Sequence, residues 1–252
     1  MLQELLTLNL FVFILIFVRV GTALMLMPGF GAAEINPTVK LVIALGISFI
    51  LVPVLQGSMP RIPTAPASLG ILFAVEALIG AFFGLVARIL ASALHVAGTI
   101  ISFVSSMTNA FIQDPIAEQQ SSTLSGFLST VGLTLIFVTD MHHLLLRTVV
   151  ESYQRFTPGQ DILVGDFADM IARYTSDAFR LGTQLSAPFI LVGLAYYVLL
   201  GILSRLMPAL PVFFIGLPLQ ITAQLILLTI GLGSMMLLFL TQFEDALVAF
   251  LG

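Results

Sequence analysis

The feature that most constrains this chain is a run of 38 consecutive residues, 206–243, without a single charged side chain. Four other uncharged runs of 20 to 25 residues precede it, at 41–60, 89–113, 119–139 and 181–204. About 20 predominantly apolar residues are enough for one helix to cross a bilayer. The runs therefore predict an all-α, polytopic membrane protein with about six to eight apolar helices, and the last run is long enough for a helical hairpin.

The composition excludes several classes of protein. Only 9% of the residues are charged and 59% are hydrophobic, with a mean hydropathy of +1.12. A soluble domain carries about 25% charged residues and leaves roughly a quarter to a third of its unfolded surface exposed. A soluble enzyme, a nucleic-acid binder and a disordered protein are excluded, because this chain cannot hide its apolar surface in water. Cysteine is absent, which excludes a disulfide framework and a thiolate metal site.

The N-terminus contains an apolar stretch, residues 5–18, that resembles a secretory signal in length. A cleavable signal carries positive charge in front of its apolar core. Here Glu4 precedes the stretch and Arg19 follows it. We therefore expect the segment to be retained as the first helix.

Polar residues concentrate at 151–180, which holds eight charged side chains. Pro158-Gly159 marks a turn near its start. From Asp166 onward, apolar residues recur at helical spacing, and this stripe predicts an amphipathic helix. The members of the stripe are Phe167, Ile171, Tyr174, Ala178 and Leu181.

We expect one integral membrane domain over residues 1–252. Its parts are N-terminal apolar helices at 1–113, a polar loop with the amphipathic helix at 147–180, and a broken apolar hairpin at 181–252. Prolines and glycines mark the joints between helices. The prolines expected to act at joints are Pro28 and Pro37 around the first turn, and Pro208, Pro211 and Pro218 in the last run. Broken backbone at membrane depth needs protein or water around it, so we expect the hairpin to lie in an assembly or beside a lined cavity.

Four ionisable residues lie inside the apolar runs: Arg19, Glu76, Arg88 and His95. Such residues are costly in lipid, so they face inward or pair. Glu76 and Arg88 cannot pair with each other, because they lie about 18 Å apart along one straight helix. We expect pairing with neighbouring helices, or snorkelling for Arg88. A proton or ion pathway through Glu76 or His95 is the alternative.

Gly80 and Gly84 form a small-residue motif that Ala87 and Ala91 continue. Small residues let two helices approach closely without a hydrophobic driving force from lipid. The motif therefore predicts a close helix contact, either within the chain or with another subunit.

Asp140, His142 and His143 suggest a metal site or an interfacial helix end. Neighbouring histidines on a helix point about 100° apart, so both cannot easily face one metal. An intramembrane hydrolase built on this group lacks a nucleophile motif. No nucleotide-binding glycine pattern is present either. We expect a helix end here, with neither a metal nor another cofactor.

The apolar run before residue 113 is rich in small polar residues. Phe103, Met107 and Phe111 follow one another at intervals of four, which places an aromatic and methionine stripe on one helical face. The run then breaks at Asp114-Pro115, because proline disfavours helix at the residue before it. The stripe is either a core face or a deformable apolar constriction that closes a pore.

Three motifs resemble the FliR family, the R subunits of the flagellar type III export gate and their injectisome counterparts. The resemblance covers nearly the whole chain, and it is carried by the order and spacing of the motifs. They are Arg19 with Pro28 and Pro37-Thr-Val-Lys40 leading to Ala44-Leu45; Phe111-Ile112-Gln113-Asp114-Pro115; and Leu203-Ser-Arg205-Leu-Met207-Pro208 with Phe213-Phe-Ile-Gly216-Leu-Pro218-Leu.

The resemblance implies a non-enzymatic subunit of the bacterial inner membrane and the flagellar basal body. One copy would join several P and Q subunits in a closed helical ring, with B-type and A-type gate proteins as further partners. The helices would form bent hairpins, largely raised out of the bilayer plane. Unfolded rod, hook and filament proteins would pass through the ring, with lipid around it and no nucleic acid.

The resemblance also implies roles for single residues. The segment 105–122 would be the plug of the closed pore, with Phe111 and Ile112 at its constriction and Phe103 and Met107 beside it. Gln113, Asp114 and Pro115 belong to the same stretch, which is richer in glutamine than the family pattern. Arg205, Pro208, Gly216 and Pro218 would form an assembly motif. The alternatives are an injectisome gate subunit and a proton-coupled small-solute transporter that uses Glu76 and His95.

Overall fold

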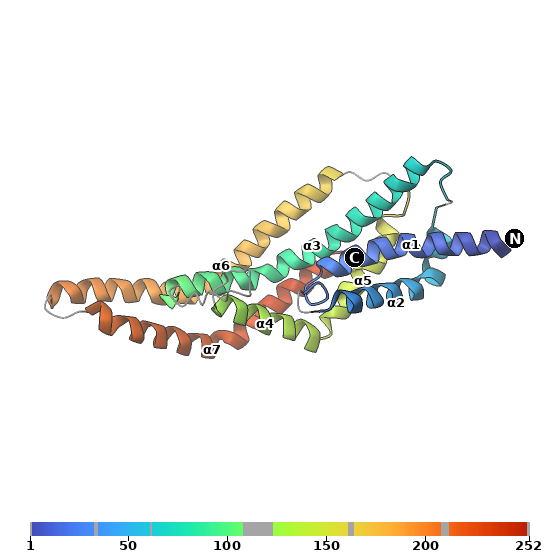
Figure 1. Cartoon of the computed structure of the whole chain (residues 1–252). Coiled ribbons are helices and arrows are strands. Elements are labelled where there is room, and N and C mark those ends of the chain that lie inside the picture. Colours follow the sequence, from blue (N-terminus) through green and yellow to red (C-terminus); the bar gives the residue numbers. More distant parts are fainter. Residues whose placement is uncertain are drawn as a thin grey trace. The chain divides into compact units, whose positions relative to one another are not determined.

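The fold is known from a computed structural model (Figure 1), which describes residues 2–32, 35–60, 62–107, 123–160, 164–207 and 212–250. Within these ranges the chain forms seven α-helices and one short 3₁₀ turn, and no strand. The prediction of an all-α protein with six to eight helices is confirmed for the described part of the chain. The helices are α1 (Leu2–Leu26), α2 (Pro37–Leu55), α3 (Pro66–Val104), α4 (Thr123–Val138), α5 (Met141–Arg155), α6 (Val164–Leu206) and α7 (Val212–Val248), with the 3₁₀ turn η1 at Gln56–Ser58.

The first turn forms where its local sequence predicts one. Gly29 adopts a φ of 85°, a conformation that glycine accepts without steric cost, three residues after α1 ends at Leu26. Asn36 then caps α2, because its side-chain oxygen accepts a hydrogen bond from the Thr38 backbone N–H at 2.9 Å. Pro37 occupies the first helical position, where its missing N–H costs nothing.

The expectation that Pro218 breaks the last apolar run is wrong, because α7 continues through it. Pro218 lies in the second turn of the helix, so its missing N–H removes one hydrogen bond, at the carbonyl four residues before it. The interruption lies instead between Leu206 and Val212. Pro208 and Pro211 lie outside the described residues.

Among the described residues, four helices are long and apolar enough to cross a membrane, namely α2, α3, α6 from Gly165 and α7 from Gly216. A fifth span is possible if α4 and α5, which are bent by 74° at the break between them, act as one. Interior prolines such as Pro188 in α6 are compatible with this class of helix, because neighbouring groups satisfy the freed carbonyl.

The described residues group into two compact units. Unit 1 comprises Met1–Leu90, Asp140–Thr175 and Asp245–Gly252, and unit 2 comprises Ala91–Thr139 and Ser176–Glu244. The long helices α3, α6 and α7 each contribute one part to each unit.

Aromatic rings form much of the core of unit 1. Phe82 stacks on Phe167 with ring centroids 4.5 Å apart, and Phe250 meets the edge of Phe83 at 5.3 Å. Phe156 joins the same group at 5.3 Å from Phe167. The buried position of Phe167 agrees with the amphipathic stripe, although α6 begins two residues before Asp166.

Close helix contacts form the core of unit 2. A Cβ at Gly98 would overlap the Ser125 backbone of α4, and one at Gly182 would overlap Val96 of α3. Because glycine has no side chain beyond a hydrogen atom at these two positions, α4 and α6 can approach α3 closely. Leu94, Leu128 and Phe239 are among the buried apolar residues of this interior.

Candidate functional site

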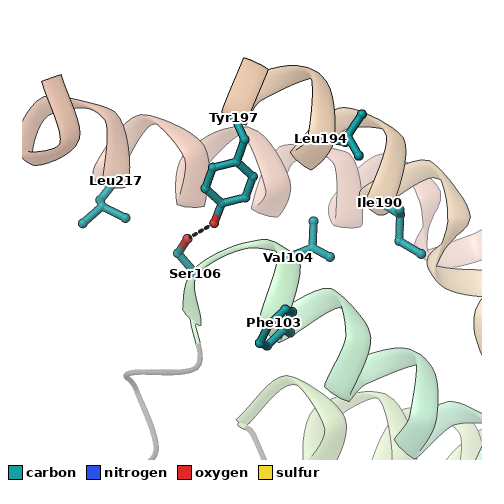
Figure 2. A pocket seen from close by; sticks show the side chains of 7 residues that line it. All are labelled: Phe103, Val104, Ser106, Ile190, Leu194, Tyr197 and Leu217. Atoms are coloured by element: carbon teal, nitrogen blue, oxygen red, sulfur yellow. Dashed lines mark hydrogen bonds between the residues drawn. The ribbon is translucent and has the colours of Figure 1, made fainter. Parts of the chain in front are cut away.

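The C-terminal end of α3 in unit 2 is held by polar side chains from α6 and α7, of which Figure 2 shows Tyr197 of α6. The Ser106 and Tyr197 hydroxyl oxygens lie 2.7 Å apart, and the Ser106 hydroxyl also donates to the Gln220 carbonyl oxygen at 3.4 Å. The Gln220 amide donates to the carbonyl of Val104 at 2.7 Å. We call these four residues, Val104, Ser106, Tyr197 and Gln220, the α3 end cluster.

The cluster supplies a hydrogen-bond donor to the end of α3 and holds the backbone that follows it. The last carbonyls of any α-helix lack an intrahelical donor, and the Gln220 amide supplies one to Val104. Ser106 follows the helix with a φ of 59°, the left-handed region in which helices commonly end and which usually requires glycine. A side chain in this conformation costs about 1–2 kcal/mol, and its hydrogen bonds offset part of that cost.

A cavity of about 460 Å³ opens beside the cluster (Figure 2). Its walls are mostly apolar, and the Ser106 and Tyr197 hydroxyls supply polar atoms. The lining residues are Phe103, Val104, Ser106, Ile190, Leu194, Tyr197 and Leu217. Phe103 is 73% exposed, so the side of α3 that faces this space is loosely packed.

A second glutamine lies one turn further along α7. Gln224 is 3% exposed, and its amide donates to the Phe189 carbonyl of α6 at 3.2 Å. Its side-chain oxygen has no hydrogen-bond partner among the described residues. Sequence reasoning missed Gln220 and Gln224 because both lie in the uncharged run. Their spacing of four residues, which places two amides on one face of an apolar helix, was the available signal.

A buried ion pair occupies unit 1. The Arg19 guanidinium donates to both carboxylate oxygens of Glu76, at 2.6 and 3.0 Å, and both side chains are fully buried. It also donates to the Ser152 hydroxyl at 3.1 Å and to the Phe156 carbonyl at 2.8 Å, and it lies 4.0 Å above the Tyr153 ring. The group, which we call the Arg19 cluster, joins α1, α3 and the C-terminal end of α5, where a cation is favourable.

The two glycines of the small-residue motif lie against α1. A Cβ at Gly80 would overlap the Arg19 carbonyl and the Thr22 hydroxyl, and one at Gly84 would overlap the Ala23 backbone. Hydrogen at these positions therefore allows α3 to approach α1 closely enough for Glu76 to reach Arg19.

The remaining predicted residues are dispersed. Arg88 and His95 are exposed on α3, Met107 is half-buried beyond its end, and Arg205 is exposed in the last turn of α6. Gly216 is buried, and its carbonyl accepts a hydrogen bond from the Tyr196 hydroxyl at 2.6 Å, whereas Pro218 is exposed. The other predicted plug and assembly residues lie outside the described part of the chain: Phe111, Ile112, Gln113, Asp114, Pro115 and Pro208.

Asp140, His142 and His143 come together at the start of α5. Their potential ligand atoms all lie within 4.8 Å of one another, and Asp140 adopts a left-handed φ of 60°. The Asp140 carboxylate and the His143 ring are 3.7 Å apart and largely exposed. Imidazole and carboxylate groups are ligands that Zn²⁺ accepts, but exposed acidic groups are common without an ion. The expected absence of a metal stays a prediction.

Comparison with known proteins gives one consistent result. The family model described as "Bacterial export proteins, family 1" matches residues 10–246. The chain is 35% identical to the flagellar biosynthetic protein FliR of Caulobacter vibrioides over 94% of each chain. It is 30% identical to the FliR protein of Bacillus subtilis over 86% of this chain and 85% of that one. It is 28% identical to the secretion system apparatus protein SsaT of Salmonella typhimurium, over 62% of this chain and 60% of that one.

Proposed function

Since the chain belongs to family 1 of the bacterial export proteins, we propose that it is a non-enzymatic subunit of the flagellar type III export gate. The observation that carries this function is the similarity to a flagellar biosynthetic protein over 94% of both chains. The apolar helices are long enough to cross a membrane, and the similarity to flagellar biosynthetic proteins supports a location in the bacterial inner membrane, at the flagellar basal body. The similarity to the injectisome relative is lower and covers less of the chain, so the flagellar role is preferred.

The subunit assembles with other proteins of the export apparatus. In our proposal one copy joins several P and Q subunits in a ring that also contacts B-type and A-type gate proteins. Support comes from the large apolar side chains that unit 2 leaves exposed, because an uncharged surface of this extent requires lipid or protein against it. Prominent members are Leu191, Leu194, Leu199, Leu206, Phe214 and Ile230.

The ring provides the path by which unfolded rod, hook and filament proteins cross the membrane. We assign the closed-pore plug to residues 105–122, with Phe111 and Ile112 at the constriction. Support comes from the α3 end cluster and its cavity, which lie where this segment begins. Phe103 on the exposed face of α3 has the deformable apolar character that a constriction requires.

The geometry does not favour the solute-transport alternative. A proton carrier needs a carboxylate that is free to exchange its proton. Both oxygens of Glu76 accept hydrogen bonds from Arg19, and the pair is shielded from solvent. Glu76 is therefore assigned to holding unit 1 together.

Deleting the chain from its source bacterium is the direct test of function. We expect loss of motility together with loss of hook and filament proteins from the medium, because the export path is incomplete without this subunit. The measurements are swimming in soft agar and analysis of secreted protein, with complementation by the intact sequence as control. A deletion strain that still swims and secretes flagellar proteins would overturn the proposal.

Replacing Phe111 and Ile112 together by alanine tests the plug assignment. We expect an assembled ring that leaks small ions, because two large apolar side chains are removed from the constriction. The measurement is ion leak in cells, normalised to ring yield. The matched control is Phe49→Ala with Ile50→Ala, a neighbouring pair of the same types exposed on α2. Equal ion tightness of the two double variants would contradict the assignment.

A further inference from the structure

We infer that the face of α3 that carries Ser92, His95 and Thr99 borders the water-filled path of the assembled gate, along which the unfolded cargo chain passes. We call these three residues the α3 polar row. This inference rests on the proposed function, because such a path exists only if the chain is an export-gate subunit. It places His95 beside the cargo and does not make it a carrier of protons.

The first step of the argument is the position of the α3 polar row on its helix. Its members lie at intervals of three and four residues, so they share one face of α3, and all three are exposed. They belong to unit 2, and His95 lies about 14 Å before the end of α3 at Val104. Other sides of this part of α3 are covered, because α4 lies against Gly98 and α6 lies against Val96. The row therefore runs along the outward side of α3 for about 10 Å.

The second step is the chemistry of the row. Ionisable groups in apolar helices are costly against lipid, and they face a bundle interior, a polar partner or a water-filled space. The ring of His95 is exposed, and it forms no hydrogen bond or ion pair with the described part of the chain. The Thr99 hydroxyl donates to the His95 carbonyl at 2.8 Å, so the helix itself satisfies that hydroxyl hydrogen. Lipid is therefore an unfavourable neighbour for this face of α3.

The third step is the contrast with the other exposed faces of unit 2. Large apolar side chains dominate the surfaces of α6 and α7 there, for example Leu199 and Ile230, and they would bind the apolar residues of an unfolded chain. Asp177 and Arg180 of α6 carry full charges, which would retain cargo segments of opposite charge. A path that many different sequences use must bind none of them tightly. Small hydroxyl side chains and one imidazole meet this condition, so the α3 polar row is the face best suited to border the path.

The experiment uses the absence of cysteine from the chain, which makes single-cysteine variants readable without background from other positions. The α3 variants are Ser92→Cys, His95→Cys and Thr99→Cys, each in the complete gate. The matched control is Ile230→Cys, at an exposed apolar position of α7. A charged, membrane-impermeant methanethiosulfonate is applied to permeabilised cells and to inverted inner-membrane vesicles, so that both sides of the membrane are reached. We expect the α3 variants to react about tenfold faster than the control from at least one side, because the reactive thiolate forms in water and not in lipid.

Arrested cargo separates the export path from other hydrated surfaces. A filament protein fused to a domain that cannot unfold should stop in the gate and slow the modification of His95→Cys to the rate of the control variant. The matched control for the cargo is the same fusion with a destabilised domain, which passes through and should give no lasting protection. Ser92→Cys and Thr99→Cys provide the same readout if the His95→Cys gate does not assemble.

Two outcomes would overturn the inference. Modification of the α3 variants by a membrane-permeant maleimide alone would show that lipid or protein covers this face. Rapid modification by the charged reagent that arrested cargo leaves unchanged would place the face in water outside the path. The deletion strain tests the proposed function separately. If that strain loses motility and secretion while either outcome is found, the gate function stands and only the position of the α3 polar row is wrong.

Discussion

Replacing Arg19 by leucine is expected to lower the free energy of unfolding by about 3–5 kcal/mol, because it leaves the Glu76 carboxylate buried without its cation. Natural domains are stable by only about 5–15 kcal/mol, so the variant should accumulate poorly in membranes. The measurement is the steady-state level of the tagged chain together with the thermal midpoint of the purified complex. Arg147→Leu is the matched control, since Arg147 is 68% exposed and its partner Glu151 keeps 24% of its side chain exposed, so the pair contributes no more than about 1 kcal/mol.

A double variant identifies the cause of the loss. Arg19→Met with Glu76→Leu removes both charges at similar volume, a change that is often neutral or stabilising for a buried pair. We expect it to recover most of the stability lost in the single variant. Equal destabilisation of single and double variants would contradict this account. The hydrogen bonds of Arg19 to Ser152 and Phe156 would then be the larger contribution.

Replacing Gly80 by valine is expected to cost about 3 kcal/mol, near the upper end for overpacking. The new side chain would overlap the Arg19 carbonyl and the Thr22 hydroxyl, and backbone atoms cannot move aside as a flexible side chain can. Pushing α3 away from α1 also lengthens the Arg19–Glu76 contact. The two effects share one cause, so Gly80→Val and Arg19→Leu should be less than additive in the thermal midpoint.

Gly70→Ala provides the control on the same helix. A Cβ at Gly70 meets nothing within 4 Å, and alanine is a better helix former than glycine by up to about 1 kcal/mol. We expect Gly70→Ala to raise the thermal midpoint slightly. We expect Gly80→Ala to lower it, although by less than Gly80→Val does. A Gly80→Val protein as stable as the unmodified one would show that the contact between α1 and α3 is not tight.

Local signals predicted the helix class and the first joint of the fold. Asn36 and Pro37 carry their own capping chemistry, so α2 begins where the sequence indicates. Pro218 shows the limit of such signals. A proline is usually a helix breaker, but its actual cost depends on its place in the helix and on what surrounds the freed carbonyl. The residues next to Pro218 in the sequence do not reveal what surrounds that carbonyl in the fold.

The partners of buried polar groups were less predictable than the helices. Arg19 and Glu76 lie 57 residues apart, and Ser152 lies 133 residues from Arg19, so no local period connects them. The sequence indicates only that each charge needs a partner in an apolar setting. Gln220 and the strained backbone of Ser106 were missed for a related reason. Neither residue carries a charge, and their hydrogen bonds form only because α3, α6 and α7 pack together in the fold.

The length of α6 has a consequence for how cells control the amount of this protein. A continuous helix of 43 residues has a contour of about 65 Å, roughly twice the hydrocarbon thickness of a bilayer. The exposed apolar residues of α6 extend from Phe179 to Leu206, about 40 Å along the axis, so a hydrocarbon core of about 30 Å does not cover all of them at once when the helix is upright. A copy made in excess of its partner proteins displays this surface to chaperones and proteases. Supply of the partners thus sets the number of surviving copies, a form of stoichiometric quality control that needs no dedicated regulator.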